Sequence, residues 1–141
     1  MRFCLILISL DISVARYGRT KSLDCVLPNT KKTLADIFLD NDCTLSPDTC
    51  SKIENGIAHL HSLGLVHNDL NPANIMFSED DIPEIIDFDS CRREGENLLK
   101  AGTPGWSDES AIVADRANDY YGLKKIKEAI SRLQKGNKRA G

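Results

Sequence analysis

The sequence contains no paired cysteine motif and no long apolar run. None of its five cysteines forms a Cys-x-x-Cys pair, so the sequence predicts no zinc site. The odd count and the lack of a disulfide framework are typical of a reducing compartment, so we expect a cytoplasmic or nuclear protein. The formal net charge is only −3, and this balance predicts neither a nucleic-acid partner nor an anionic membrane partner.

The first ten residues form a short apolar segment that permits two interpretations. One positive charge precedes the run, and residues 13–15 could serve as a weak cleavage site, so a signal peptide is one interpretation. A buried strand is the other, because the run is too short to span a bilayer. We favour the strand, since nothing downstream is typical of a secreted protein. The mixed polar segment over residues 11–30 predicts a loop or linker.

Helical patterns are clear in three later segments. Thr33 is a suitable N-cap for a short helix that ends near Leu39. Ser46 is expected to cap a second helix, and Gly64 to follow its last turn in a left-handed conformation. A final helix is predicted over residues 118–134. The expected buried faces of the last two helices are Cys50, Ile53, Ile57 and Leu60, and Leu123, Ile126, Ile130 and Leu133.

Brief apolar runs separated by polar turns indicate short strands between the last two helices. With 141 residues, 41% of them apolar and 28% charged, the chain is sufficient for one globular domain with a modest core. The predicted fold class is α+β and mainly helical, with the domain over residues 31–134 and a frayed basic tail over 135–141. The expected strands are residues 65–66, 75–77 and 84–86, with a turn over 78–81 between the last two.

The most informative stretch runs from His67 to Asn74 and is followed 13 residues later by Asp87-Phe88-Asp89. Magnesium prefers hard oxygen ligands, and a carboxylate and an amide from two loops can hold the metal against a polyphosphate. A further carboxylate near the acceptor hydroxyl can orient it and receive its proton. Asp69 and Asn74 share one loop and Asp87 follows a strand pair, so this order predicts phosphoryl transfer.

These residues resemble the protein kinase family. The family's catalytic loop, His-Arg-Asp-Leu-x-x-x-x-Asn, is similar to His67-Asn68-Asp69-Leu70 with Asn74 in register, and its Asp-Phe-Gly is similar to Asp87-Phe88-Asp89. The resemblance implies ATP and Mg²⁺ as cofactors, Asp69 as the catalytic carboxylate with Asn71 beside it, and Asn74 and Asp87 as magnesium ligands. It also implies structural support from His67, Phe88, Thr103 and Asp119.

Further segments extend the resemblance over residues 31–134. Residues 102–106, Gly-Thr-Pro-Gly-Trp, are similar to the Gly-Thr-x-x-Tyr stretch that closes a kinase activation segment, where the Thr helps to position the catalytic Asp. Residues 119–122 resemble the start of the large buried helix of the kinase C-lobe, where the Asp braces the catalytic loop. The resemblance therefore implies a kinase-like C-lobe in which short hairpin strands carry the catalytic and magnesium loops.

The sequence departs from the family pattern at several positions. Asn68 replaces the Arg that pairs with a phosphorylated activation loop, and Asn71 replaces a Lys whose charge offsets phosphate. Asp89 replaces the Gly of Asp-Phe-Gly, and Glu109 is a candidate for the missing Ala-Pro-Glu element. No Gly-x-Gly-x-x-Gly occurs, so we expect an N-lobe that is largely missing, with residues 3–10 as its last strand.

Four functions remain open from the sequence. The resemblance implies ATP-dependent phosphorylation of Ser or Thr in a protein substrate, by a chain that is truncated. The absent glycine loop and lysine favour a second hypothesis, a pseudokinase that acts as a binding module. Asn71 and the phrase Ile86-Asp87-Phe88-Asp89 also suit small-molecule phosphotransferases of the aminoglycoside or choline kinase type. The fourth is a globular α/β fragment whose turn residues match the pattern by chance.

Overall fold

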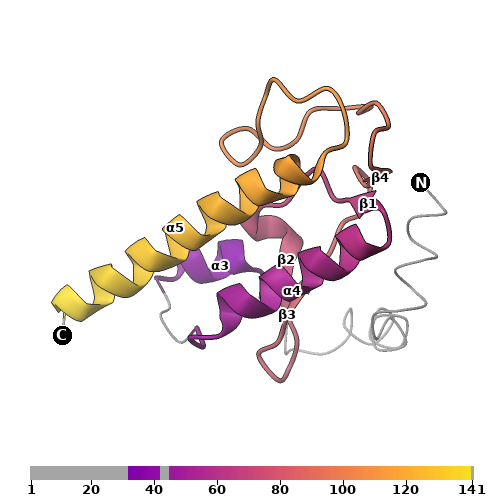
Figure 1. Cartoon of the computed structure of the whole chain (residues 1–141). Coiled ribbons are helices and arrows are strands. Elements are labelled where there is room, and N and C mark those ends of the chain that lie inside the picture. The colour runs from indigo at the N-terminus through magenta and orange to yellow at the C-terminus, as the bar shows by residue number, and fades with distance from the viewer. Residues whose placement is uncertain (1–31, 42–44, 141) are drawn as a thin grey trace, which may run out of the picture.

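The structure is a computed structural model that describes residues 32–41 and 45–140. The N-terminal strand and the linker predicted over residues 1–30 lie outside the described residues. Three α-helices and two small antiparallel sheets make up the regular structure of the described part (Figure 1).

The first described helix, α3 (Leu34–Leu39), confirms the predicted start and end. Thr33 is the N-cap, and its side chain accepts a hydrogen bond from the Asp36 N–H at 3.2 Å. The Asp36 carboxylate accepts in return from the Thr33 N–H at 2.9 Å, which completes a capping box. These hydrogen bonds, first that from the Thr33 N–H and then that from its hydroxyl, lower the pKa of Asp36 below its ordinary value.

Helix α4 (Thr49–Ser62) buries the predicted apolar face but begins later than expected. Ser46 is not its N-cap: Asp48 holds that position, and the Ser46 carbonyl accepts from the Thr49 N–H in a turn that precedes the helix. Gly64 follows the helix with a φ of +75°, and its N–H donates to the His61 carbonyl, as a left-handed C-cap requires.

The strands form two separate antiparallel pairs. β1 (Leu65–Val66) pairs with β4 (Arg92–Arg93), and β2 (Ile75–Phe77) pairs with β3 (Pro83–Ile85). Strand β3 begins and ends one residue before the predicted 84–86. The β2–β3 hairpin turns over residues 78–82, where Ser78 and Ile82 close the loop through a backbone hydrogen bond of 2.9 Å.

The final helix, α5, is longer than predicted and runs over Arg116–Ala140. The prediction of a frayed tail is wrong for residues 135–140, which continue this helix. Lysine and arginine are good helix formers, and Lys138 and Arg139 lie in the last turn, where cations interact favourably with the negative end of the helix dipole. The same positive charge that suggested a solvated tail is therefore compatible with a helix end.

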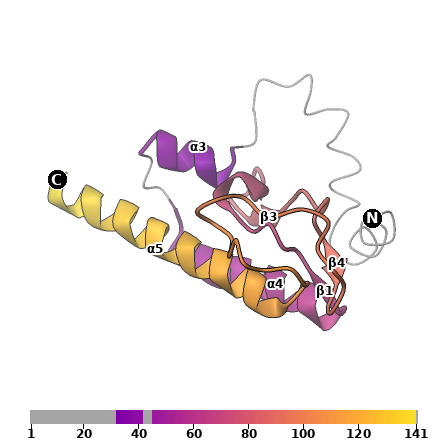
Figure 2. The same cartoon turned by 90° about the horizontal axis from the view of Figure 1, so that it is seen from above.

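The main core lies between α5, α4, α3 and the β2–β3 hairpin. Figures 1 and 2 show α5 running beside α4, with the hairpin packed against α4 and α3 against the hairpin. The predicted faces of α4 and α5 meet there except for Leu60, which packs with Leu65 and Cys91 in a second cluster. Each fully buried Ile or Leu contributes about 1.5–3 kcal/mol. The buried core residues are Leu34, Ile37, Ile53, Ile57, Leu70, Ile75, Phe77, Leu123, Ile126 and Ile130.

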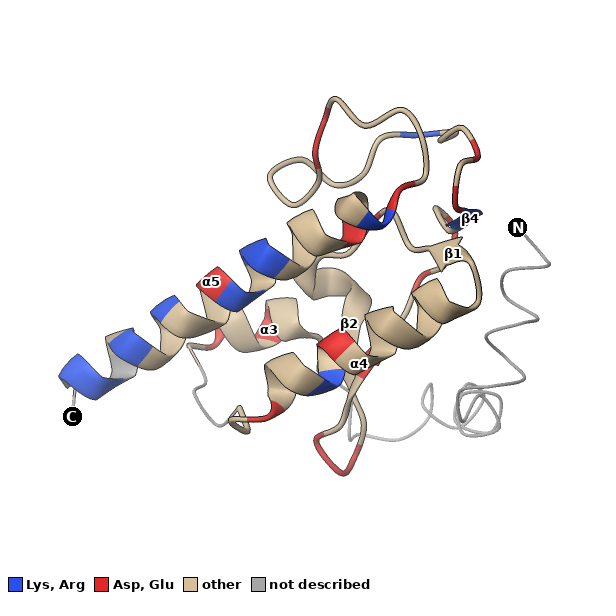
Figure 3. Cartoon of the chain, viewed as in Figure 1, with Lys and Arg blue, Asp and Glu red and all other residues tan. Residues whose placement is uncertain are grey.

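Charges are distributed unevenly over the surface. Figure 3 shows Lys and Arg along α5, whereas Glu79, Asp80 and Asp81 gather at the turn between β2 and β3. No helix in the described part of the chain is long and apolar enough to cross a membrane. Most of the buried polar side chains, by contrast, cluster around the segment that follows β1, and this segment holds the candidate site.

Candidate active site

The loop that carries Asp69 runs from the end of β1 to a 3-10 turn, η1 (Pro72–Asn74), which leads directly into β2. Pro72 has the fixed backbone angle that suits a first helical position. Asn71 precedes it as the N-cap, and its Oδ1 accepts from the Ala73 N–H at 2.9 Å. The sequence Asn-Pro-Ala-Asn therefore folds locally into a tight turn that returns Asn74 towards Asp69.

The Asp69 carboxylate is held by residues from two segments. Its Oδ1 accepts from the Thr103 N–H at 2.9 Å, from the Thr103 hydroxyl at 2.6 Å and from the Asn71 amide at 3.1 Å. The Asn74 amide donates to the Asp69 backbone carbonyl at 2.8 Å and approaches Oδ2 at 3.4 Å. One oxygen of the carboxylate is thus fixed by three donors, while the other keeps acceptor capacity for an incoming hydroxyl.

The structure brings Asp87 to the same loop through its two neighbours. The Ile86 N–H donates to the Asn74 carbonyl at 2.9 Å, and the Ile86 carbonyl accepts from His67 Nε2 at 2.9 Å. His67 Nδ1 accepts from the Asp69 N–H, so the proton of the neutral ring lies on Nε2. The His67 ring meets the Phe88 ring edge-on, with centroids 5.3 Å apart. Asp87 therefore lies between two residues that contact the Asp69 loop.

Asp119, in the first turn of α5, holds the backbone of this loop. It is fully buried, and its two oxygens accept from the backbone N–H groups of His67 and Asn68, each at 2.9 Å. His61, at the end of α4, brings its Nε2 to 2.8 Å from the same carboxylate. A carboxylate is favourable at a helix N-terminus, so α5 both carries and stabilises the group that fixes the loop.

Three features of the site were missed by the sequence-based interpretation. Asn68 was interpreted only as a lost arginine, yet its side chain is buried and joins three segments. His61 was assigned no contact with Asp119. Gly122 packs so closely that an added Cβ would lie 2.4 Å from the Leu70 carbonyl oxygen. The Asp-Tyr-Tyr-Gly run contained a signal for this approach, because a glycine within a helix is costly unless packing requires it.

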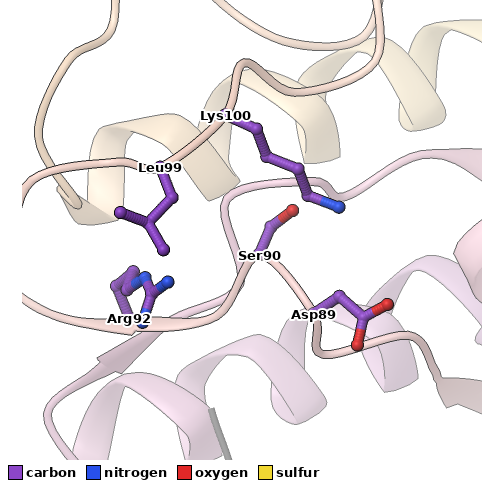
Figure 4. A pocket seen from close by; sticks show the side chains of 5 residues that line it. All are labelled: Asp89, Ser90, Arg92, Leu99 and Lys100. Atoms are coloured by element: carbon purple, nitrogen blue, oxygen red, sulfur yellow. The ribbon is translucent and has the colours of Figure 1, made fainter.

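A cavity of about 310 Å³ lies beside the segment that follows Asp87. Figure 4 shows Arg92 and Leu99 at one end of the cavity and Asp89 at the other, with Ser90 and Lys100 between them. Asp89, which replaces a glycine of the family pattern, is exposed and its N–H contacts Asp87 Oδ1 at 3.4 Å. Asp87 itself has a φ of +59°, a conformation that Asp adopts more readily than most residues.

The donor atoms fit magnesium. The Asn74 amide contacts Asp69 through its nitrogen in both cases. Within the described residues, Asn74 Oδ1 accepts no hydrogen bond. The Asp87 carboxylate is exposed and, among the residues that the structure describes, accepts only the long contact from Asp89. These are hard oxygen ligands of the kind that Mg²⁺ uses beside phosphate oxygens. No cluster of three or more His, Cys, Asp or Glu suited to a metal occurs in the described part, so a soft or zinc-type centre is not indicated there.

Comparison with known proteins gives the class of this fold and site. The sequence matches the protein kinase domain family over residues 24–124, and the chain therefore belongs to the eukaryotic-type protein kinase family. The helices and small antiparallel sheets are consistent with part of a kinase fold. ATP and Mg²⁺ are the cofactors that the family uses in general.

Individual relatives are protein kinases from several organisms. A probable LIM domain-containing serine/threonine-protein kinase of Dictyostelium discoideum is 38% identical over 64 residues, covering 43% of this chain and 10% of that protein. Serine/threonine-protein kinase Tao of Drosophila melanogaster is 30% identical over 73 residues, covering 52% of this chain and 7% of that protein. A probable protein kinase of D. discoideum is 44% identical over 69 residues, covering 49% and 18%. The chain thus spans less than a fifth of the length of each of these relatives.

Proposed function

We propose that the described residues form the catalytic and magnesium-binding part of a kinase C-lobe, which acts in transfer of the γ-phosphoryl group of ATP to a Ser or Thr hydroxyl of a protein. The observation that carries this proposal is the set of contacts that joins the Asp69 loop to the residues flanking Asp87. The relatives named above as serine/threonine kinases support the choice of acceptor.

In this proposal Asp69 holds the acceptor hydroxyl and takes its proton. Thr103 and Asn71 fix one carboxylate oxygen, so the second is the atom that faces the hydroxyl. A positioned general base contributes about 10²- to 10⁴-fold to the rate. Because the fixed oxygen already accepts three hydrogen bonds, its orientation does not have to be established when the substrate binds.

Asn74 and Asp87 would hold the metal ions through Oδ1 and the carboxylate. Bound magnesium-ATP supplies the transferable phosphoryl group and neutralises the charge on its oxygens. His67 and Phe88 keep the Asp87 segment against the Asp69 loop, and Asp119 fixes the backbone of that loop. Each of these residues therefore acts on the geometry of the oxygen ligands rather than on the phosphoryl group itself.

The sequence supplies no Gly-x-Gly-x-x-Gly cover for the phosphates. We therefore propose that the isolated chain binds nucleotide weakly and transfers phosphate slowly, because water keeps access to the reacting oxygens. The same missing motif favours the alternative, in which the chain binds partners without transferring phosphate. Residues 31–134 are the proposed extent of the C-lobe, and the helical continuation of α5 through Ala140 adds to it.

A transfer assay with γ-labelled ATP tests the proposal. The full chain is incubated with Mg²⁺ and either a Ser/Thr peptide library or a panel of amino-alcohols and aminoglycosides. Labelled peptides that depend on Asp69 support the proposal, and labelled small molecules would indicate a small-molecule phosphotransferase instead. Absence of transfer, combined with nucleotide binding, would leave the binding-module function. Asn71 gives the small-molecule result a physical basis, since a neutral amide stands where a lysine offsets phosphate charge in serine/threonine kinases.

A further inference from the structure

Asn68 occupies a buried and conformationally restricted position next to Asp69. Its φ is +68°, a left-handed conformation that Asn adopts more readily than most residues. Only 6% of the residue is exposed, and its N–H donates to Asp119 Oδ1. The position therefore demands a residue that tolerates this backbone and satisfies its own polar atoms without water.

The side-chain amide of Asn68 meets these demands completely. Its Nδ2 donates both hydrogens, one to the Val66 carbonyl at 3.1 Å and one to the Ser90 carbonyl at 2.9 Å. Its Oδ1 accepts from the Asn118 amide at 3.1 Å, and Asn118 Nδ2 also donates to the Val113 carbonyl at 2.9 Å. Asn68 thereby links β1, the segment after Asp87 and the first turn of α5.

The bond to Ser90 gives the Asp87 segment a second attachment to the Asp69 loop. On its N-terminal side, Ile86 is bonded to Asn74 and His67. On its C-terminal side, the Ser90 carbonyl is bonded to Asn68. The four-residue turn over 87–90 is thus fixed at both ends by neighbours of Asp69, which restricts the positions that the Asp87 carboxylate can take.

We infer that Asn68 is a positioning residue that sets the place of Asp87, and hence the metal affinity of the site, through neutral hydrogen bonds. An arginine here would bring a charge that needs an anion to balance it, and it has no acceptor for the Asn118 amide. The Asn68 and Asn118 amides require no added phosphate, so the segment is ordered without modification of the chain. The inference rests on the proposed role of Asp87 as a magnesium ligand.

Asn68→Gly is the most direct variant, because glycine adopts the left-handed backbone without strain while all side-chain bonds are lost. Asn118→Ala removes the bond to Asn68 Oδ1 and the bond to the Val113 carbonyl, and leaves the Ser90 bond in place. Ile130→Val serves as the control: it destabilises the core of α5 by a methyl group and lies 11 residues from Asp119, about 16 Å along the helix.

Two measurements on the full chain test whether Asn68 positions Asp87. The first is the Mg²⁺ concentration that gives half of the thermal stabilisation by ATP, and the second is hydrogen exchange at the Cys91 amide, which closes the turn by donating to the Phe88 carbonyl. Asn68→Gly should raise the Mg²⁺ midpoint about fivefold and accelerate this exchange about fivefold, as loss of one net hydrogen bond predicts. Asn118→Ala should shift both in the same direction by less.

The outcomes separate the inference from the proposed function. If Asn68→Gly moves neither the Mg²⁺ midpoint nor the Cys91 exchange beyond the change in Ile130→Val, the positioning role is refuted. If the parent chain shows no magnesium-dependent response to ATP, the proposed function fails, while the exchange data still decide whether Asn68 holds the turn. An Mg²⁺ midpoint that shifts equally in all three variants would indicate general destabilisation and would also overturn the inference.

Discussion

Replacement of Asp119 by Asn tests how strongly the catalytic loop depends on a buried carboxylate. The parent carboxylate accepts from three groups: the N–H groups of His67 and Asn68, and His61 Nε2. An Asn at 119 can place its oxygen where two of these donors converge, but its NH₂ group must then face the third donor. Asp119→Ala would leave all three donors unsatisfied, so Asp119→Asn is the more measurable change.

The cost of Asp119→Asn can be estimated from these contacts. One buried N–H loses its acceptor, at about 1–3 kcal/mol, and the two remaining bonds lose charge assistance, at about 1 kcal/mol each. Relief from burying a charge offsets part of this sum. We therefore expect a loss of about 2–4 kcal/mol, a large fraction of the stability of a small domain.

Urea unfolding followed by far-UV circular dichroism measures this loss. Asp115→Asn is the matched control. Asp115 is exposed, and its carboxylate accepts from the Ala117 N–H at the start of the same helix. Asn is an equally good residue at this position. The control should change the free energy of unfolding by less than about 0.5 kcal/mol. A loss below about 1 kcal/mol in Asp119→Asn would refute the conclusion that the Asp119 carboxylate stabilises the catalytic loop.

Three further predictions, the first with a matched control variant, follow from the structure. Gly122→Ala should destabilise the chain by about 1–3 kcal/mol, since its Cβ would meet a backbone carbonyl of the loop at 2.4 Å. Gly136→Ala on the same helix has open space and should stabilise it by up to about 1 kcal/mol; equal effects in urea unfolding would contradict the packing. Asp36→Asn should be less stable than the parent at neutral pH, because the Thr33 bonds lower the Asp36 pKa and so stabilise the folded state above the ordinary value of 3.8. This difference should shrink as the pH falls below 3.8, and a difference that persists in acid would argue against the capping carboxylate. Asp69→Asn should reduce phosphate transfer by about 10²-fold or more while circular dichroism stays unchanged, and retained transfer would exclude Asp69 as the base.

The helices were predictable where local chemistry and periodicity agree. Thr33 is the N-cap that its residue type predicts, and Ile53, Ile57 and Leu60 of the predicted α4 face are buried as their spacing requires. The start of α4 was wrong because Ser46, Pro47 and Asp48 all favour helix starts, and propensity alone does not separate them. The end of α5 was wrong because charged residues suit a solvated tail and a solvated helix equally well.

The family motifs implied the site residues and the supporting roles of Thr103 and Asp119, but not the contacts of Asn68 and His61. The turn at Asn71-Pro72 and the strand pair bring Asn74 and Ile86 together through local hydrogen bonds. The contacts of Asp119 and Asn68 span about 50 residues, and local patterning specifies neither of them; only the family resemblance pointed to Asp119. Comparison with the family motif indicates only what Asn68 lacks relative to arginine, whereas the Asn68 amide makes bonds that arginine cannot make.

Magnesium-dependent nucleotide binding tests the central claim most directly. Isothermal titration of the full chain with ATP, with Mg²⁺ and then with excess EDTA, should show binding that requires the metal in the parent chain. Asp87→Asn should remove the metal-dependent part, since an amide is a weaker magnesium ligand than a carboxylate. Binding that is equal with and without the metal, or unchanged in Asp87→Asn, would contradict the assignment of Asp87 and Asn74 to one metal site beside Asp69.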